Sequence, residues 1–215
     1  MLKKKSFFVT FEGIEGSGKS YLSNKLFNFL KKKKYKVVKT REPGGTPVAE
    51  KIRKIILDDY FSNNKVVKFD KNTDTLLYLA ARNEHLINKI KPTLSKGKII
   101  ICDRFIDSTL AYQVYGKGVN INFVNSIHDH ILGGLRPDLT FVLKVNISTA
   151  MKRLNKRKKK NRYDKFSKSF YIKAQKAFIK IANKNKKKYV ILNNSRDNND
   201  IENIIYKKIN NFLKK

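Results

Sequence analysis

Three things are scarce in this 215-residue sequence: cysteine, long apolar runs and acidic residues. With a single cysteine, Cys102, the chain has no partner for an internal disulfide, which favours a reducing compartment. No apolar run approaches the roughly 20 residues that a membrane-spanning helix needs. The run from Phe7 to Phe11, behind Lys3 to Lys5, is too short for a secretory signal. We therefore expect a cytoplasmic protein that makes no membrane contact.

Acidic residues number 17 against 49 lysines and arginines, so the formal net charge is +32. Such a balance favours a phosphate-rich partner such as nucleic acid. The basic residues are, however, spread along the whole chain among many asparagines, which is typical of compositional drift and of a solvated basic surface. We expect no specific nucleic-acid partner, although the charge total alone leaves that alternative open.

The order of apolar patterns predicts an α/β fold. Short β-rich runs alternate with longer amphipathic stretches, as in a parallel sheet joined by crossover helices. The expected strands are residues 6–11, 35–40, 98–102, 139–145 and 189–192, and the expected helices are residues 19–32, 47–57, 74–89, 119–132, 148–157, 168–183 and 200–213. No repeat or long linker divides the chain, so we expect a single domain over residues 1–215. Ligands bind such sheets at the carboxyl ends of the strands, which directs attention to the loops there.

A complete phosphate-binding loop (P-loop) follows the first expected strand. Its residues are Gly13, Ile14, Glu15, Gly16, Ser17, Gly18, Lys19 and Ser20, and Tyr21 comes next in the helix that they open. The glycines let backbone N–H groups turn inward to cradle phosphates, and the helix adds the positive end of its dipole. Lys19 is expected to reach the transferred phosphate and the Ser20 hydroxyl to bind Mg²⁺. The loop therefore predicts a site for ATP and Mg²⁺ but does not identify the acceptor.

An arginine beside an acid follows each of the next two strands. Arg41 and Glu42 come after the second strand, and Asp103 and Arg104 come after the third. The planar guanidinium group suits phosphate oxygens. One such pair is usually a surface ion pair of little consequence, but pairs at successive strand ends should converge on the P-loop. They indicate a second phosphate site, for the acceptor.

Taken together, these motifs resemble those of bacterial thymidylate kinases. The resemblance covers essentially the whole chain, and the segments that carry it are Phe11 to Gly16, Arg41 to Thr46, Leu79 to Arg82, Asp103 to Gln113 and Arg136 to Thr140. The resemblance implies a P-loop NTPase fold, with a five-stranded parallel sheet between layers of helices and a short lid that closes over ATP. It also implies a homodimer and phosphoryl transfer from ATP to dTMP, a step in dTTP biosynthesis.

The resemblance also assigns roles within the acceptor site. It implies that Arg41 and Arg104 hold the phosphate of dTMP, while Asp103 supports the Mg²⁺ and phosphate network. It places Glu15 near the sugar 3′-hydroxyl and Tyr112 against C2′, where a ribonucleotide would clash.

For the thymine base, the resemblance implies stacking on Tyr78 and a hydrogen bond from Arg82, with Ser108, Thr109 and Gln113 lining the same site. Tyr78 and Arg82 are four residues apart, so on a helix they share one face. An aromatic residue at this spacing is also typical of a core position, and the residues alone leave both interpretations open.

The lid is expected over residues 153–166. The variable P-loop positions contain no arginine, so the resemblance implies that a lid arginine stabilises charge on the transferred group, with Arg153, Arg157 and Arg162 as the candidates. A solvated basic loop is the alternative interpretation.

The chain departs from the family pattern at three positions. Lys144 and Asn161 stand where aspartate is usual, and Val114 stands where glycine is frequent. These changes affect the lid and the loop near Tyr115 but not the expected site.

Two other functions remain open at this point. One is a kinase for another nucleoside monophosphate, against which the segment Arg41 to Thr46 and Tyr112 both argue. The other is a nucleic-acid-dependent P-loop ATPase, in which Asp103 would activate water. That second function would leave the arginine-bearing loops without a role.

Overall fold

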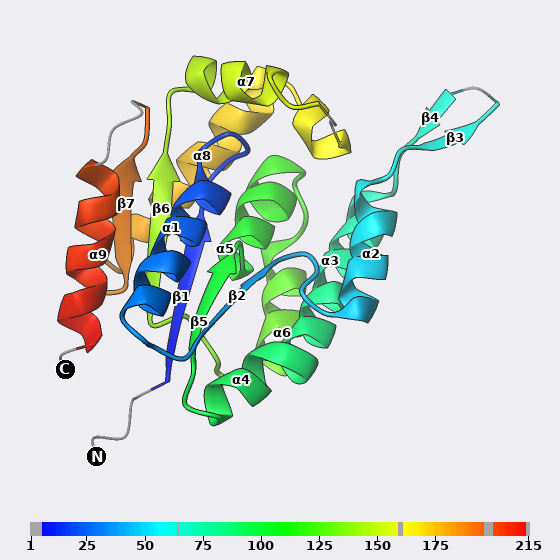
Figure 1. The fold of residues 1–215 in the computed structure, drawn as a ribbon. Helices are drawn as coiled ribbons and strands as arrows, with labels where there is room; N and C mark the ends of the chain where they lie inside the picture. The colour runs from blue at the N-terminus through cyan, green and yellow to red at the C-terminus, as the bar shows by residue number, and fades with distance from the viewer. Residues whose placement is uncertain (1–5, 64, 159–160, 196–199, 214–215) are drawn as a thin grey trace.

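The computed structural model describes residues 6–63, 65–158, 161–195 and 200–213 (Figure 1). A five-stranded sheet with the order β2-β5-β1-β6-β7 forms its centre, and every neighbouring pair is parallel. The strands are β1 Phe7–Glu12, β2 Val37–Arg41, β5 Ile99–Asp103, β6 Leu139–Lys144 and β7 Tyr189–Asn193. The α/β prediction is confirmed, and each expected strand is present within two residues of its expected bounds.

Helices lie on both faces of this sheet (Figure 1). They are α1 Lys19–Lys32, α2 Pro47–Leu57, α3 Lys71–His85, α4 Lys91–Ser95, α5 Ile106–Thr109, α6 Ile121–Leu132, α7 Ile147–Asn155, α8 Lys168–Asn183 and α9 Asp200–Leu213. Among the described residues, three further helical segments are not α-helical. Two are π-helical, η1 Leu86–Ile90 and η2 Leu110–Gly116, and one is the 3-10 turn η3 Arg162–Lys165. Helix α3 therefore continues through η1 into α4, and α5 continues into η2.

The alternation of side chains along β1 builds the core on both faces of the sheet. Phe7, Val9 and Phe11 pack with the apolar sides of α1 and α9. Phe8 points to the opposite face, where it packs with residues of η1, β5 and α6. A third apolar cluster joins β6, α7, α8 and η2. Both faces of the sheet are thus covered, which explains why its strands are nearly continuous apolar runs.

Besides the short α4 and η3, two structures have no counterpart among the expected elements. The first is an antiparallel hairpin of β3 Tyr60–Ser62 and β4 Lys65–Val67, which projects from the end of α2 (Figure 1). Its strand residues are all exposed, so no apolar and polar alternation marks them in the sequence. The second is the helix formed by α5 and η2, which starts directly after the segment Asp103 to Phe105. In the part of the chain that the structure covers, no helix combines the length and apolarity needed to cross a bilayer.

Candidate active site

The P-loop connects the carboxyl end of β1 to the first turn of α1. Gly13 has a φ of +139°, and a Cβ atom there would lie 2.6 Å from the carbonyl oxygen of Leu143 in β6. Gly18 has a φ of +94°, and its Cβ would lie 2.4 Å from Nδ2 of Asn194. Both positions require glycine, because the backbone is left-handed and neighbouring atoms leave no room for a side chain. These glycines let the loop turn directly into the start of α1, and a helix N-terminus at this place fits a phosphate ligand.

Lys19 is buried against the P-loop. Its Nζ donates a 2.7 Å hydrogen bond to the carbonyl oxygen of Ile14. Burial, helped by the positive charge of Arg104, lowers the pKa of Lys19 from 10.5 to about 8. The ammonium group thus keeps its charge at neutral pH but is poorly solvated. A buried cation at this place is ready to exchange a carbonyl partner for a phosphate oxygen.

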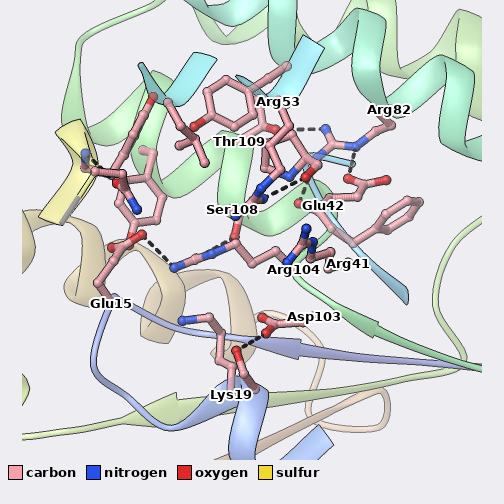
Figure 2. Close-up of a pocket in the computed structure, with 18 of the residues that line it drawn as sticks. Glu15, Lys19, Arg41, Glu42, Arg53, Arg82, Asp103, Arg104, Ser108 and Thr109 are labelled. Carbon is pink, nitrogen blue, oxygen red and sulfur yellow. Dashed lines mark hydrogen bonds and ion pairs between the residues drawn. The ribbon is translucent and has the colours of Figure 1, made fainter. Parts of the chain in front are cut away.

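Ser20 and Asp103 meet at the edge of a cavity that Lys19 also lines. The Ser20 hydroxyl donates a 2.5 Å hydrogen bond to Oδ2 of Asp103, at the end of β5 (Figure 2). A hydroxyl and one carboxylate form an oxygen set that suits Mg²⁺, which is commonly bound through few protein groups together with phosphates and water. No cluster of three or more potential metal-binding side chains occurs among the residues with described positions. The residues present therefore fit a metal ion that arrives with a nucleotide.

Arg104 links the P-loop to the acceptor side of the cavity. Its Nη2 donates to Oε1 of Glu15 at 2.8 Å (Figure 2). Its Nη1 donates to the carbonyl oxygen of Gly13 at 2.9 Å. Burial alone would lower the pKa of Arg104, but the combined effect of Glu15, Tyr112, Asp103 and Glu12 outweighs burial, and the pKa is raised. Glu15 also accepts a short hydrogen bond from the Tyr112 hydroxyl. Glu15 thus sets the positions of a cation and an aromatic ring.

The Arg104 backbone is left-handed, with a φ of 72°. This conformation is unfavourable for a non-glycine residue, and non-glycine residues that adopt it are concentrated at functional sites. Here the conformation occurs at the turn between β5 and α5, directly beside the P-loop.

Arg82 is held by a network of protein groups. Its Nε donates to Oε2 of Glu42 at 2.7 Å, Nη1 to Oγ1 of Thr109 at 2.8 Å, and Nη2 to the carbonyl oxygen of Phe105 at 2.9 Å. Nη1 also pairs with Nε2 of His128 at 2.7 Å. The side chain is 2% exposed yet borders the cavity. Its expected hydrogen bond to a base stays a prediction, and the structure adds that Arg82 joins α3 to the loop after β5.

Three tyrosines form an aromatic wall of the cavity. Tyr78 of α3 and Tyr112 of η2 each meet Tyr163 edge to face, with ring centroids 5.8 and 5.9 Å apart. Tyr163 belongs to η3, within the expected lid. One wall of the cavity therefore combines a helix, a π-helical turn and the lid.

Arg41 lies at the open side of the cavity, at the end of β2. It forms a bidentate ion pair with Glu50 of α2, with Nη2 3.0 Å from Oε2. Its side chain is 56% exposed. An exposed pair of this kind is weak, so Arg41 is able to change partner when an anion arrives.

One cavity brings together most of the expected site residues. Its lining includes Glu15, Lys19, Ser20, Arg41, Tyr78, Arg82, Asp103, Arg104, Ser108, Thr109, Tyr112, Gln113 and Arg157. The expected residues outside the lining are the P-loop backbone positions Gly13, Ile14, Gly16, Ser17 and Gly18, together with Tyr21, Arg153 and Arg162. Tyr21 points its hydroxyl to Glu202 of α9 at 2.8 Å.

Seven lining residues were not among the expected site residues, namely Glu42, Pro43, Arg53, Leu57, Phe105, Asn161 and Tyr163. Arg53 donates to the carbonyl oxygen of Pro43 at 2.7 Å and is held there by α2. No local motif distinguishes it from other basic helix residues. Tyr163 had a usable signal, because it follows the Asn161-Arg162 pair that marks the lid.

The lid arginines have three different positions. Arg153 donates to the carbonyl oxygens of Gly16 and Asn194 at 3.1 Å, so it braces the back of the P-loop. Arg157 borders the cavity and donates to Oδ1 of Asp164 at 2.7 Å. Arg162 pairs with Asp74 of α3. Of these three, Arg157 alone lines the cavity.

A P-loop with a buried lysine, facing two arginines across a cavity with an aromatic wall, defines a P-loop phosphotransferase for a small phosphorylated acceptor. A model of the family described as "Thymidylate kinase" matches residues 11–205. The chain belongs to the thymidylate kinase family, a family of nucleoside monophosphate kinases.

Curated relatives and a solved structure agree with this assignment. The thymidylate kinase of Staphylococcus haemolyticus is 37% identical over 210 residues, which are 97% of this chain and 100% of the relative. That of Geobacillus sp. is 39% identical over 191 residues, 88% of this chain and 89% of the relative. The crystal structure of thymidylate kinase from Ehrlichia chaffeensis matches with a TM-score of 0.74 at 33% identity, covering 95% of this chain and 99% of that one. The P-loop NTPase fold predicted from the sequence is confirmed.

Proposed function

We propose that this protein transfers the γ-phosphoryl group of ATP to the phosphate of dTMP, which gives ADP and dTDP. The observation that carries the proposal is the single cavity that joins Lys19 of the P-loop to Arg41 and Arg104 at the ends of β2 and β5. Donor and acceptor phosphates would meet between these cations. Family membership supplies thymidylate as the acceptor.

ATP would be held by the P-loop backbone and by Lys19, with Mg²⁺ at Ser20 and Asp103. The metal ion would supply positive charge to the phosphate oxygens. Ser20 and Asp103 already face each other, so they are positioned to share such a ligand. Asp103 thus serves the metal and leaves the phosphate contacts to the neighbouring Arg104.

The acceptor would bind with its phosphate toward Arg41 and Arg104 and its base toward Tyr78. Tyr112 is the buried member of the aromatic wall that donates to Glu15, a place that suits steric selection against a 2′-hydroxyl. Gln113 and Thr109 lie on the same side, and Ser108 donates to buried Glu12 while bordering the cavity. These side chains come from elements that pack tightly together, so the acceptor site is largely preformed.

In the reaction, an oxygen of the dTMP phosphate attacks the γ-phosphorus of ATP, and the bond from that phosphorus to the β–γ bridging oxygen breaks. Neither step needs a strong base, because phosphoryl transfer depends on positioning and charge stabilisation. Lys19 stabilises the transferred group from the P-loop side. Arg104 fixes the nucleophile, and Arg157 adds charge from the lid. We assign residues 153–166 to this lid, within one kinase domain that spans residues 1–215.

A homodimer and a cytoplasmic location complete the proposal. Helices α2 and α3 pack together and leave apolar side chains about half exposed on their outer sides, among them Val48, Ile55 and Leu76. A second copy of the chain is the occupant that we propose for this surface. Light scattering should give a dimer for the wild type and a monomer for Leu76→Glu, whereas Ile204→Glu on α9 should stay dimeric. A monomeric wild type would refute the dimer. The proposed location rests on the single buried Cys102, which fits a reducing compartment.

A panel of nucleoside monophosphates tests the function. ADP formation from ATP and Mg²⁺ should be fastest with dTMP, and single-stranded DNA should produce no stimulation. Equal use of dTMP, UMP and CMP would instead indicate another monophosphate kinase. Stimulation by DNA without any monophosphate would indicate a nucleic-acid-dependent ATPase.

A further inference from the structure

A buried carboxylate lies outside the phosphate-transfer machinery, at the junction of α3, η2 and the lid. Asp74, in the first turn of α3, is 1% exposed. An acid at this position of a helix is ordinarily a solvated group that complements the helix dipole. Burial of an ionised carboxylate is instead unfavourable unless several partners compensate it. The partners of Asp74 therefore indicate what it does.

Those partners come from two directions. From the body of the protein, Lys117 donates to Oδ2 at 2.7 Å, and Gln113 donates to the same oxygen at 3.3 Å. From the lid, Arg162 pairs with Oδ1, and the Tyr163 hydroxyl donates to Oδ2 at 3.0 Å. Asp74 is thus an acceptor that both of these neighbouring lid residues share.

The lid residues at this junction reach the acceptor cavity through Tyr163. Its ring packs edge to face against Tyr78 and Tyr112, and it borders the cavity. Arg162 stays outside the cavity lining and packs over the rings of Phe69 and Tyr163, with its Cζ 5.2 and 5.4 Å from their centroids. Asp74 thus contacts the aromatic wall through the Tyr163 hydroxyl.

We propose that Asp74 is a positioning residue that latches the lid over the acceptor cavity, acting through Arg162 and Tyr163. It touches no reacting atom. The link to acceptor binding rests on the function proposed above, whereas the latch itself rests on the contacts alone. The proposal assigns Arg162 to lid closure and separates it from Arg157, which faces the cavity.

Limited proteolysis tests the latch without reference to activity. Arg162 and Lys165 lie in η3, which Asp74 holds, so trypsin should cut after them when the lid detaches. We expect Asp74→Asn to be cut there about tenfold faster than the wild type, measured as the ratio of lid fragments to fragments from the rest of the chain. The matched control is Glu84→Gln on the same helix, whose carboxylate accepts from Asn88, and it should stay within about twofold of the wild type.

An unchanged ratio in Asp74→Asn would overturn the latch. If Asp74→Asn is cut throughout the chain, the milder Tyr163→Phe decides in the same way, because it removes only the hydroxyl that donates to Asp74. Faster lid cleavage in Tyr163→Phe supports the proposal, and wild-type cleavage refutes it.

Kinetics then tests the link to the acceptor. Asp74→Asn should raise KM for dTMP about tenfold while kcat and KM for ATP change less than about threefold. Arg162→Gln should raise KM for dTMP by a similar factor. The double variant should have a KM close to that of either single variant, because both substitutions remove the same interaction. A fall in kcat at unchanged KM would contradict a positioning role. A wild type that is inactive with dTMP but keeps the proteolysis difference would refute the proposed function and leave the latch standing.

Discussion

Glu15 of the P-loop and Arg104 at the end of β5 form an ion pair with 2.8 Å between Oε1 and Nη2. The pair joins the loop expected to hold ATP to the arginine expected to hold the acceptor phosphate. Both side chains are largely buried, at 12% and 15% exposure, so the interaction is poorly screened by solvent. Donor and acceptor sites are therefore connected by one pair of side chains.

Glu15→Gln should loosen Arg104 without removing it. We expect KM for dTMP to rise about tenfold, a loss of about 1.4 kcal/mol in binding, because the ion pair becomes a weaker hydrogen bond from Arg104 to a neutral amide. KM for ATP should change little, since the P-loop backbone is unaffected. Steady-state kinetics with each substrate varied in turn measures both values. The exposed Asp58→Asn, after α2, serves as the control, and an equal effect of the two variants would disprove the role of Glu15.

Tyr112 offers a test of sugar selection. Tyr112→Ala should narrow the preference for dTMP over its ribose counterpart about tenfold, because the ring that would clash with a 2′-hydroxyl is gone. Tyr112→Phe keeps the ring and should keep the preference, although it loses the hydrogen bond to Glu15. The ratio of kcat/KM values for the two substrates is the measurement. A preserved ratio in Tyr112→Ala would reduce Tyr112 to a packing residue.

The lid arginines should separate by their positions. Arg157→Ala is expected to lower kcat roughly 10³-fold while ATP binding weakens much less, as for an arginine finger supplied in cis. Arg153→Ala should instead raise KM for ATP, because Arg153 braces the carbonyl oxygen of Gly16. Single-turnover assays, with the exposed Lys152→Ala as control, measure the transfer step. If the transfer rates of the Arg153, Arg157 and Arg162 variants all stay within about tenfold of the wild-type rate, a loss of at most ~1.4 kcal/mol, the lid covers the site without stabilising the transferred group.

His128 predicts how stability depends on pH. Burial, with the charges of Arg82 and Arg136, lowers its pKa from 6.5 to about 3. Between these values the unfolded chain binds a proton that the folded chain does not, so stability falls as the pH drops below 6.5. From pH 7 to pH 5 the wild type should lose about 2 kcal/mol more than His128→Asn does, measured by urea unfolding. His130→Asn, exposed on the same helix, should behave like the wild type, and equal losses in all three proteins would exclude this role of His128.

Local sequence motifs predicted the part of the site that depends on backbone geometry. The P-loop glycines, Lys19 and Ser20 form a contiguous motif whose structure follows from chain geometry alone. Asp103 and Arg104 were placed correctly at the cavity, because parallel strands bring their carboxyl ends to one edge. The positions of these residues could be predicted without knowledge of side-chain packing.

Other features depend on contacts between distant segments and left no sequence pattern. Asp74 looks like a helix-start acid, and only the packing of η2 and η3 around it makes it a buried acceptor. The helix of residues 106–116 contains Thr109, Tyr112 and Val114, which are weak helix formers, so its tertiary contacts decide its structure. Asn161 was noted as a departure from the family pattern, yet its side chain caps η3 by accepting from the N–H groups of Tyr163 and Asp164.

The central claim is that Lys19 serves phosphoryl transfer from ATP to dTMP, and a single-turnover experiment tests it most directly. Enzyme in excess over γ-³²P-labelled ATP is mixed with dTMP and Mg²⁺, and the labelled products are separated. The wild type and Lys25→Ala, changed at a half-exposed position of the same helix, should move the label into dTDP. Folded Lys19→Ala should show no measurable transfer, because it loses the buried cation at the P-loop, where such contacts are worth several kcal/mol. Label released as inorganic phosphate by the wild type, or dTDP formed by Lys19→Ala at a near-normal rate, would contradict the account.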